Sequence, residues 1–120
     1  MEKMIFVIDD NDANLTVAAS ALEDEYMVLT MPGAERMFKI LEKKRPNLIL
    51  LDIEMPEMDG FEALSKLKDN PEWDDIPVVF LTGRTDEGFE QKARNTKVLD
   101  IVKKPFTKEN LLDTVKKYIS

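Results

Sequence analysis

The stretch Ile5-Phe6-Val7-Ile8-Asp9-Asp10 places two carboxylates directly after four consecutive apolar residues. Three further apolar runs also end at a polar group: residues 48–51 at Asp52, residues 78–81 at Thr82, and residues 98–102, interrupted by Asp100, at Lys103-Lys104-Pro105. Short apolar runs are typical of strands that are covered on both faces of a parallel sheet. Neighbouring parallel strands end at one edge of their sheet, where such folds bind ligands, so we expect these polar side chains to share one cleft.

Between these runs the apolar residues follow a helical period. They recur at the spacing of one helix face in Leu15, Ala18, Ala19 and Leu22, and again in Ala34, Met37, Phe38 and Leu41. Three more helices are expected: one that opens at Gly60, a weak one after Asp86, and a last one capped by Thr107. Residues 27–30 form a short strand that ends without a charged group, so we expect it at a sheet edge away from the cleft. Five strands alternating with five helices predict an α/β fold with a doubly wound parallel sheet.

The composition is that of one globular domain, which we expect to span residues 1–120. A net charge of −7 opposes binding to nucleic acid and to anionic membrane surfaces. No apolar run approaches the roughly 20 residues of a membrane-spanning helix, and we expect no secretory signal at the N-terminus. The chain has no cysteine and no histidine, which excludes disulfides and phosphohistidine on this chain and favours a cytoplasmic location.

Asp9, Asp10 and Asp52 would bring up to three carboxylates together at the expected cleft. Like charges at that distance raise one another's pKa or require a cation, and Mg²⁺ suits two or three carboxylates with a phosphate. The alternative is a structural role, in which Asp10 or Asn11 caps the first helix and Asp52 merely begins a loop. Both interpretations remain open for the acidic pair.

Lys104 and Thr82 extend the cluster from the ends of two later strands. Lys104 can neutralise an anion bound to Asp52, and Thr82 can donate a hydrogen bond to it. Together these groups suit a tetrahedral dianion on a carboxylate, in which the carboxylate is itself the phosphoryl acceptor. The chain has no Gly-rich phosphate loop, which argues against nucleotide binding.

Four segments in a fixed order carry a resemblance to a known family: Ile8-Asp9-Asp10, the decapeptide at 51–60, Leu81-Thr82-Gly83 and Lys104-Pro105-Phe106. Along essentially its whole length, the chain resembles the receiver domain of two-component response regulators, of the single-domain CheY-like type. The resemblance implies a flavodoxin-like (βα)5 fold with strand order 2-1-3-4-5. It also implies a phosphorylation-dependent switch of a two-component or phosphorelay system, which catalyses only its own phosphorylation and slow dephosphorylation.

The resemblance assigns the acidic residues their roles. Asp52 would be phosphorylated by a histidine kinase or a histidine phosphotransfer protein. Mg²⁺ would be bound directly by Asp10 and Asp52, through water by Asp9, and by the main-chain carbonyl of Glu54.

The same resemblance implies roles for other residues of the four segments. Thr82 would turn toward the phosphoryl group after modification, and Lys104 would contact a phosphoryl oxygen. The peptide between Lys104 and Pro105 is cis in the family. Asp59 would cap a helix, and Gly60 would be free to take a positive φ.

Three features depart from the family pattern. Ile101 stands where members usually have Tyr or Phe, so we expect Thr82 to shift the loop after the fourth strand directly rather than move a ring. Lys97 stands where many members have Gly, which predicts a different turn there. The fourth helix offers only Phe89 and Ala93 to the core, so we expect a loosely held element.

We expect downstream proteins to bind the fourth helix, the fifth strand and the last helix of a monomer that can dimerise on phosphorylation. Glu54 and Arg84 are hypothesised to form an ion pair over the cleft mouth that slows hydrolysis, and two solvated charges are the alternative.

Two other functions remain open: an aspartyl-nucleophile phosphatase of the haloacid dehalogenase type, and a receiver used only for docking. The phosphatases normally have Asp at the position of Glu54, and docking receivers usually lack Asp52, Lys104 or the acidic pair.

Overall fold

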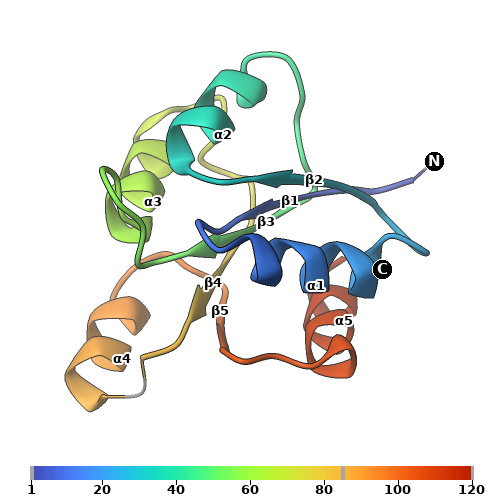
Figure 1. The fold of residues 1–120 in the computed structure, drawn as a ribbon. Coiled ribbons are helices and arrows are strands. Elements are labelled where there is room, and N and C mark those ends of the chain that lie inside the picture. Colours follow the sequence, from blue (N-terminus) through green and yellow to red (C-terminus); the bar gives the residue numbers. More distant parts are fainter. Residues whose placement is uncertain (1, 85, 120) are drawn as a thin grey trace.

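The computed structural model describes residues 2–84 and 86–119, and within them five parallel strands alternate with five helices (Figure 1). The strands are β1 (Met4–Ile8), β2 (Met27–Met31), β3 (Leu48–Asp52), β4 (Val78–Thr82) and β5 (Asp100–Lys103). The helices are α1 (Asp12–Leu22), α2 (Ala34–Leu41), α3 (Gly60–Asp69), α4 (Glu87–Arg94) and α5 (Lys108–Tyr118). The strand order β2-β1-β3-β4-β5 confirms the predicted doubly wound, flavodoxin-like topology.

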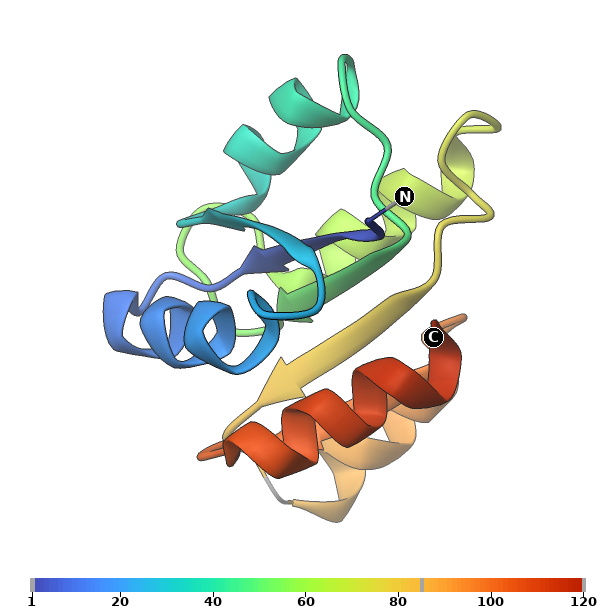
Figure 2. The same cartoon turned by 90° about the vertical axis from the view of Figure 1, so that its right-hand side faces the viewer.

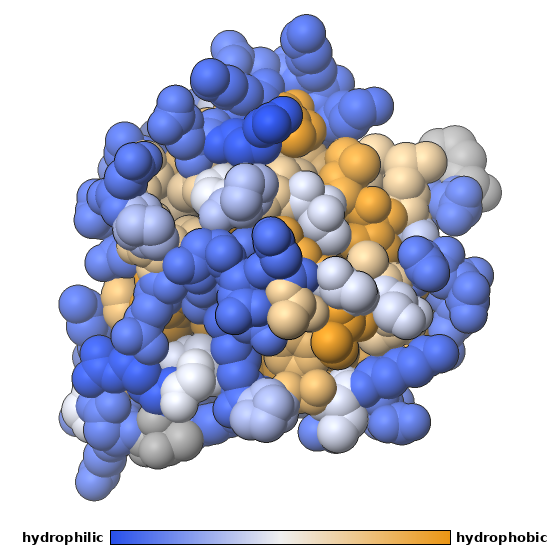
Figure 3. Space-filling model, in the orientation of Figure 1, coloured by the Kyte–Doolittle hydropathy of each residue, from blue (hydrophilic) through white to orange (hydrophobic). Residues whose placement is uncertain are grey.

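Helices lie on both faces of the sheet (Figure 2). Each face carries its own apolar core. α2, α3 and α4 cover the face that includes Phe6, Leu51 and Phe80, whereas α1 and α5 cover the opposite face. β3 and β4 are buried along their whole length, as strands in the middle of a covered sheet should be. Hydrophilic residues coat most of the surface in Figure 3, while apolar side chains reach it over β2 and α1, where Met27 is 45% exposed. β2 is an edge strand, as predicted.

Side-chain caps begin four of the helices. Asn11, Asp59, Asp86 and Thr107 each accept a hydrogen bond from a main-chain N–H in the first turn of the helix that follows. The predicted caps at Asp59 and Thr107 are therefore confirmed. At α1 the cap is Asn11, which leaves Asp10 free of that role.

The prediction for Gly60 is wrong about its backbone. Among the residues described, only Glu57 has a positive φ, at 70°. Gly60 is instead required by close packing, because a Cβ there would lie 2.7 Å from the carbonyl oxygen of Asp52 and 2.7 Å from the Cα of Ile53. Lys97 does not take a positive φ.

The segment from α4 to β5 shows one further difference. β5 begins at Asp100, not near Val98, because the Val98 N–H donates to the Thr96 hydroxyl at 3.4 Å and stays in the preceding turn. α4 buries only Phe89 and Ala93, as predicted. None of the described helices combines the length and the apolar character that a bilayer crossing requires.

Candidate functional site

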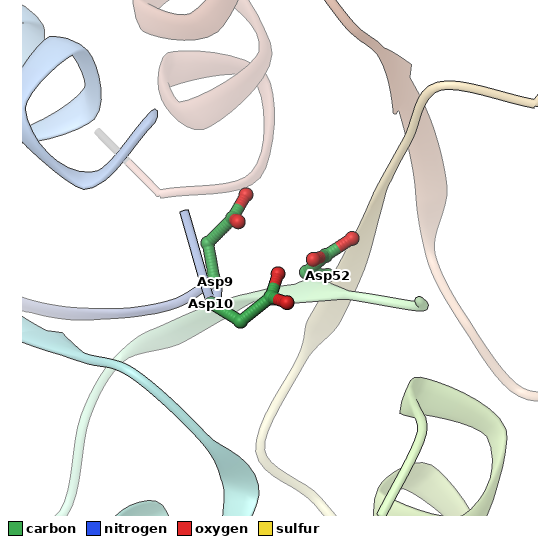
Figure 4. Close-up of side chains that lie close together, drawn as sticks. All are labelled: Asp9, Asp10 and Asp52. Atoms are coloured by element: carbon green, nitrogen blue, oxygen red, sulfur yellow. The ribbon is translucent and has the colours of Figure 1, made fainter. Parts of the chain in front are cut away.

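An acidic cluster forms at the carboxyl edge of the sheet, where β1 and β3 end side by side. The register pairs Ile8 with Leu51, so Asp9 and Asp52 leave neighbouring strands at the same level. One carboxylate oxygen from each of Asp9, Asp10 and Asp52 lies within 4.8 Å of the others, and Figure 4 shows the three side chains close together. Asp9 and Asp52 are buried, whereas Asp10 is exposed at the mouth of the cluster.

Lys104 crosses the cluster from the loop after β5. Its Nζ lies 2.7 Å from Asp9 Oδ2 and 2.9 Å from Asp52 Oδ1. Its main-chain N–H donates to the Thr82 carbonyl at 2.7 Å, and its peptide bond with Pro105 is cis, as predicted. Burial alone would lower the pKa of Lys104, but the hydrogen bonds to the two carboxylates raise it above its usual value. Lys104 is therefore a stable ammonium between two buried carboxylates.

Asp9 is held on both of its oxygens. Oδ1 accepts the Asn11 N–H at 2.9 Å, and Oδ2 accepts the Asn14 side-chain amide at 3.2 Å in addition to Lys104. The sequence reasoning missed Asn14. The position of Asn14 in the sequence could have indicated this contact. Asn14 lies in the first turn of the helix that Asn11 caps, and from there its side chain can reach back toward the end of β1.

Asp52 ends β3 and is only 3% exposed. Its Oδ1 accepts from Lys104 at 2.9 Å and from the Glu54 main-chain N–H at 3.3 Å. Burial raises the pKa of Asp52 to about 6; the Lys104 hydrogen bond acts in the opposite direction, and the charge of Asp9 raises the pKa further. With a pKa of about 6, this side chain is mostly ionised at neutral pH.

The charge of the cluster is unbalanced. Three carboxylates face one ammonium, which leaves two negative charges at the mouth of a largely buried site. Oxygen donors with excess negative charge are the ligands that hard divalent cations prefer. The donor set present here therefore fits such a cation.

Thr82 ends β4 beside β3 and is 1% exposed. Its hydroxyl oxygen accepts the main-chain N–H of Arg84 at 3.0 Å. The structure thus brings the predicted Asp9, Asp52 and Lys104 into direct contact, with Asp10 at the mouth, and places Thr82 at the end of the adjacent strand.

The hypothesised ion pair between Glu54 and Arg84 is not formed. Arg84 donates twice to Asp86, at 3.0 and 3.1 Å, and its guanidinium lies 4.6 Å from the ring centre of Phe89. The Arg84 hydrogen bond holds the pKa of Asp86 below its usual value. A two-point pair with a near neighbour is geometrically favoured over a single contact across the cleft, so Arg84 is directed toward α4.

Comparisons with known proteins identify the family. Residues 5–116 match the family model of the response regulator receiver domain. The polar-differentiation response regulator DivK of Brucella anthropi is 28% identical over 99% of this chain and 98% of its own length. A Vibrio cholerae protein named "Probable cyclic di-GMP phosphodiesterase" is 35% identical over 84% of this chain, which spans 23% of that longer protein.

Among solved structures, the fold matches the receiver domain of the sensor histidine kinase PA1611 from Pseudomonas aeruginosa PAO1, which holds a magnesium ion in its active site cleft. The TM-score is 0.89 at 23% identity, and the match covers 99% of this chain and 98% of the other. The family match extends over almost all of the chain, from β1 to α5. The chain therefore belongs to the response regulator receiver domain family, whose members are the switches of phosphorelay signalling.

Proposed function

We propose that Asp52 accepts a phosphoryl group from a phosphohistidine on a histidine kinase or a histidine phosphotransfer protein. The observation that carries the proposal is that Lys104 and the Glu54 N–H both contact Oδ1 of this buried carboxylate, which lies beside Asp9 and Asp10. Oδ2 would attack phosphorus. An O–P bond then forms as the P–N bond of the phosphohistidine breaks, and the imidazole leaves with that electron pair and takes up a proton.

Two neighbouring side chains would stabilise the phosphoryl group. Lys104 already lies 2.9 Å from Asp52 Oδ1, so its positive charge is in place before the transfer begins. The Thr82 hydroxyl would donate a hydrogen bond to a phosphoryl oxygen after giving up its present bond to the Arg84 N–H.

We further propose Mg²⁺ as the cofactor. Asp10 and Asp52 would bind it directly, Asp9 through water, and Glu54 through its main-chain carbonyl. The support is the excess negative charge of the cluster and the exposed position of Asp10, which is not needed as a helix cap. When bound, the ion would neutralise charge on the transferred phosphoryl group. The PA1611 receiver domain holds magnesium in its cleft.

In this proposal the domain is a regulator whose only chemistry is on itself. Slow dephosphorylation follows when water attacks phosphorus, the P–O bond to Asp52 breaks, and inorganic phosphate leaves.

We propose a single receiver domain over residues 1–120 that works in the cytoplasm as a monomer and can dimerise on phosphorylation. A downstream protein would bind the surface formed by α4, β5 and α5, where Leu99 is 47% exposed. The net charge of −7 argues against nucleic acid and membranes as partners.

Intact mass spectrometry with acetyl phosphate as the donor tests the acceptor. Wild type should gain one phosphoryl group in Mg²⁺ and none in excess chelator, and Asp52→Asn should gain none. Asp113→Asn is the matched control, because Asp113 is exposed on α5 and should not affect the reaction. An adduct on Asp52→Asn equal to that on wild type would contradict the proposal.

A second measurement separates the remaining alternatives. Release of inorganic phosphate from a small phosphate ester over many turnovers would indicate a phosphatase. No adduct on wild type, even with a phosphorylated kinase as donor, would indicate a domain that acts by docking alone.

A further inference from the structure

The Thr82 hydroxyl is tied to the loop that leads into α4. It accepts the Arg84 N–H at 3.0 Å, and Thr82 is almost fully buried. A buried hydroxyl changes rotamer by exchanging one partner for another, since leaving a buried polar group unpaired is costly. If Thr82 turns toward an anion on Asp52, the main-chain N–H of Arg84 therefore loses its acceptor.

The side chain of Arg84 fastens the same residue to the first turn of α4. Its guanidinium donates twice to Asp86, and the Asp86 carboxylate also caps α4 by accepting the Phe89 N–H at 3.2 Å. The guanidinium lies 4.6 Å from the Phe89 ring centre, which is a cation–π contact. Arg84 thus contacts both the cap of α4 and the one aromatic residue of that helix.

Phe89 continues this connection into the core. Its ring meets the ring of Phe61 on α3 edge to face, with centres 5.8 Å apart, and Phe61 meets Phe80 on β4 in the same way at 5.4 Å. Ile101 on β5 packs against the same cluster as a half-buried aliphatic side chain. Rings from β4, α3 and α4 therefore form this aromatic group, and Ile101 on β5 contributes no ring to it.

We propose that Arg84 is a positioning residue that couples the Thr82 hydroxyl to α4. The inference rests on phosphorylation of Asp52 as proposed above. In the unmodified protein, the Thr82 hydroxyl holds the main chain of Arg84 while Phe89 and Asp86 hold its side chain. When Thr82 turns toward a phosphoryl group, the main chain at Arg84 shifts, the guanidinium leaves the Phe89 ring, and the first turn of α4 moves.

Coupling of this kind is reciprocal. The contacts that keep Arg84 on Phe89 oppose the turn of Thr82, so their removal favours the state in which an anion is bound. Loss of one exposed cation–π contact corresponds to roughly a threefold change in affinity. Arg84→Ala should therefore bind a phosphoryl mimic about threefold more tightly than wild type, and should transmit less of the change to α4.

Glycine amides provide the reporters for the test. In a sample labelled with ¹⁵N-glycine, Gly83 reports the residue after Thr82 and Gly88 reports α4. The titrant is beryllium fluoride with excess Mg²⁺, which mimics a phosphoryl group on a carboxylate. In wild type both signals should shift along one saturation curve. In Arg84→Ala the Gly83 signal should still shift, with its midpoint at an about threefold lower concentration of beryllium fluoride. The Gly88 shift should fall to less than about half of its size in wild type.

Two further variants show whether geometry or charge is responsible. Arg84→Lys keeps a cation near the ring without the two-point pair, so it should restore part of the Gly88 shift. Arg94→Ala removes the same charge from the last turn of α4 and should behave as wild type. A full Gly88 shift in Arg84→Ala, or an unchanged affinity, would overturn the inference. A wild type in which Gly83 does not respond would instead overturn Asp52 as the acceptor, so the two failures are distinguishable.

Discussion

α3 and α4 are neighbours on one face of the sheet, where Phe61 contacts Phe89, but different interactions hold them. α3 is joined to the acidic cluster by its main chain. The Gly60 N–H donates to the Ile53 carbonyl at 2.8 Å, and the backbones approach so closely that no Cβ fits at residue 60. Beyond this contact, α3 buries three apolar side chains, Ala63, Leu64 and Leu67.

α4 is held mainly by groups at the surface. Only Phe89 and Ala93 are buried, and the other attachments include the Arg84 contacts, an ion pair between Lys103 and Glu90, and the Lys92 ammonium 4.4 Å from the ring centre of Phe61. Burial of apolar area is retained under most conditions, whereas exposed ion pairs are individually weak and sensitive to salt. The difference indicates that α3 keeps the acidic cluster rigid, while α4 is the helix that a change at the cluster can displace.

The same substitution in the two helices gives the strongest test of this contrast. Gly60→Ala should destabilise the protein by about 3 kcal/mol, because the new methyl group would overlap main-chain atoms of Asp52 and Ile53. Gly88→Ala should have the opposite sign and stabilise by up to about 1 kcal/mol, because its Cβ meets nothing within 4 Å and alanine favours helix. Urea unfolding measures both. Equal effects of one sign would contradict the description of α3 as the rigidly docked helix.

The carboxylate of Asp52, whose main chain lies against Gly60 at the start of α3, provides the second test. Burial raises the pKa of Asp52 to about 6 from 3.8, so the folded protein binds this proton more tightly than the unfolded chain does. The stability that protonated Asp52 contributes is fully present below about pH 3.8 and is lost as the pH rises through about 6. Asp52→Asn avoids that loss, so without Mg²⁺ it should be more stable than wild type by on the order of 2 kcal/mol at neutral pH.

The pH dependence is what identifies the cause. The stabilities of wild type and Asp52→Asn from urea unfolding should converge toward about pH 4, separate between about pH 4 and pH 6, and differ by a constant amount above about pH 6, as the raised pKa of Asp52 requires. Asp113→Asn, on the exposed side of α5, should follow wild type throughout. A stability difference that is constant across this range would show that the asparagine acts through packing and not through charge.

The sequence predicts the strand ends better than it predicts contacts between helices and loops. Asp9, Asp52, Thr82 and Lys104 could be assigned to one edge, because sheet topology alone determines where parallel strands end. Arg84 could not be assigned, because Glu54 and Asp86 were both within reach and only the geometry of the two-point pair decides between them. Asn14 was missed for the same reason, since its role depends on a rotamer that reaches back to Asp9. The sequence indicated that residue 60 needs to be glycine. The reason, a close approach of two backbones, is visible only in three dimensions.

The ion pair between Lys103 and Glu90 gives the smallest expected effect and separates the two helices by their response to salt. Lys103 Nζ lies 2.6 Å from Glu90 Oε1, and both side chains are partly exposed. Lys103→Gln should speed hydrogen exchange of the α4 amides at low salt, because it removes one of the few attachments of that helix. At roughly 1 M salt, where the Debye length is about 3 Å, exchange in wild type and variant should coincide. Lys66→Gln, on the exposed side of α3, should change exchange in neither helix, because burial and not charge holds α3. If exchange in α3 rose as much as in α4, or if the difference in α4 survived high salt, the two helices would be held by the same kind of interaction, and the division between a rigid and a displaceable helix would fail.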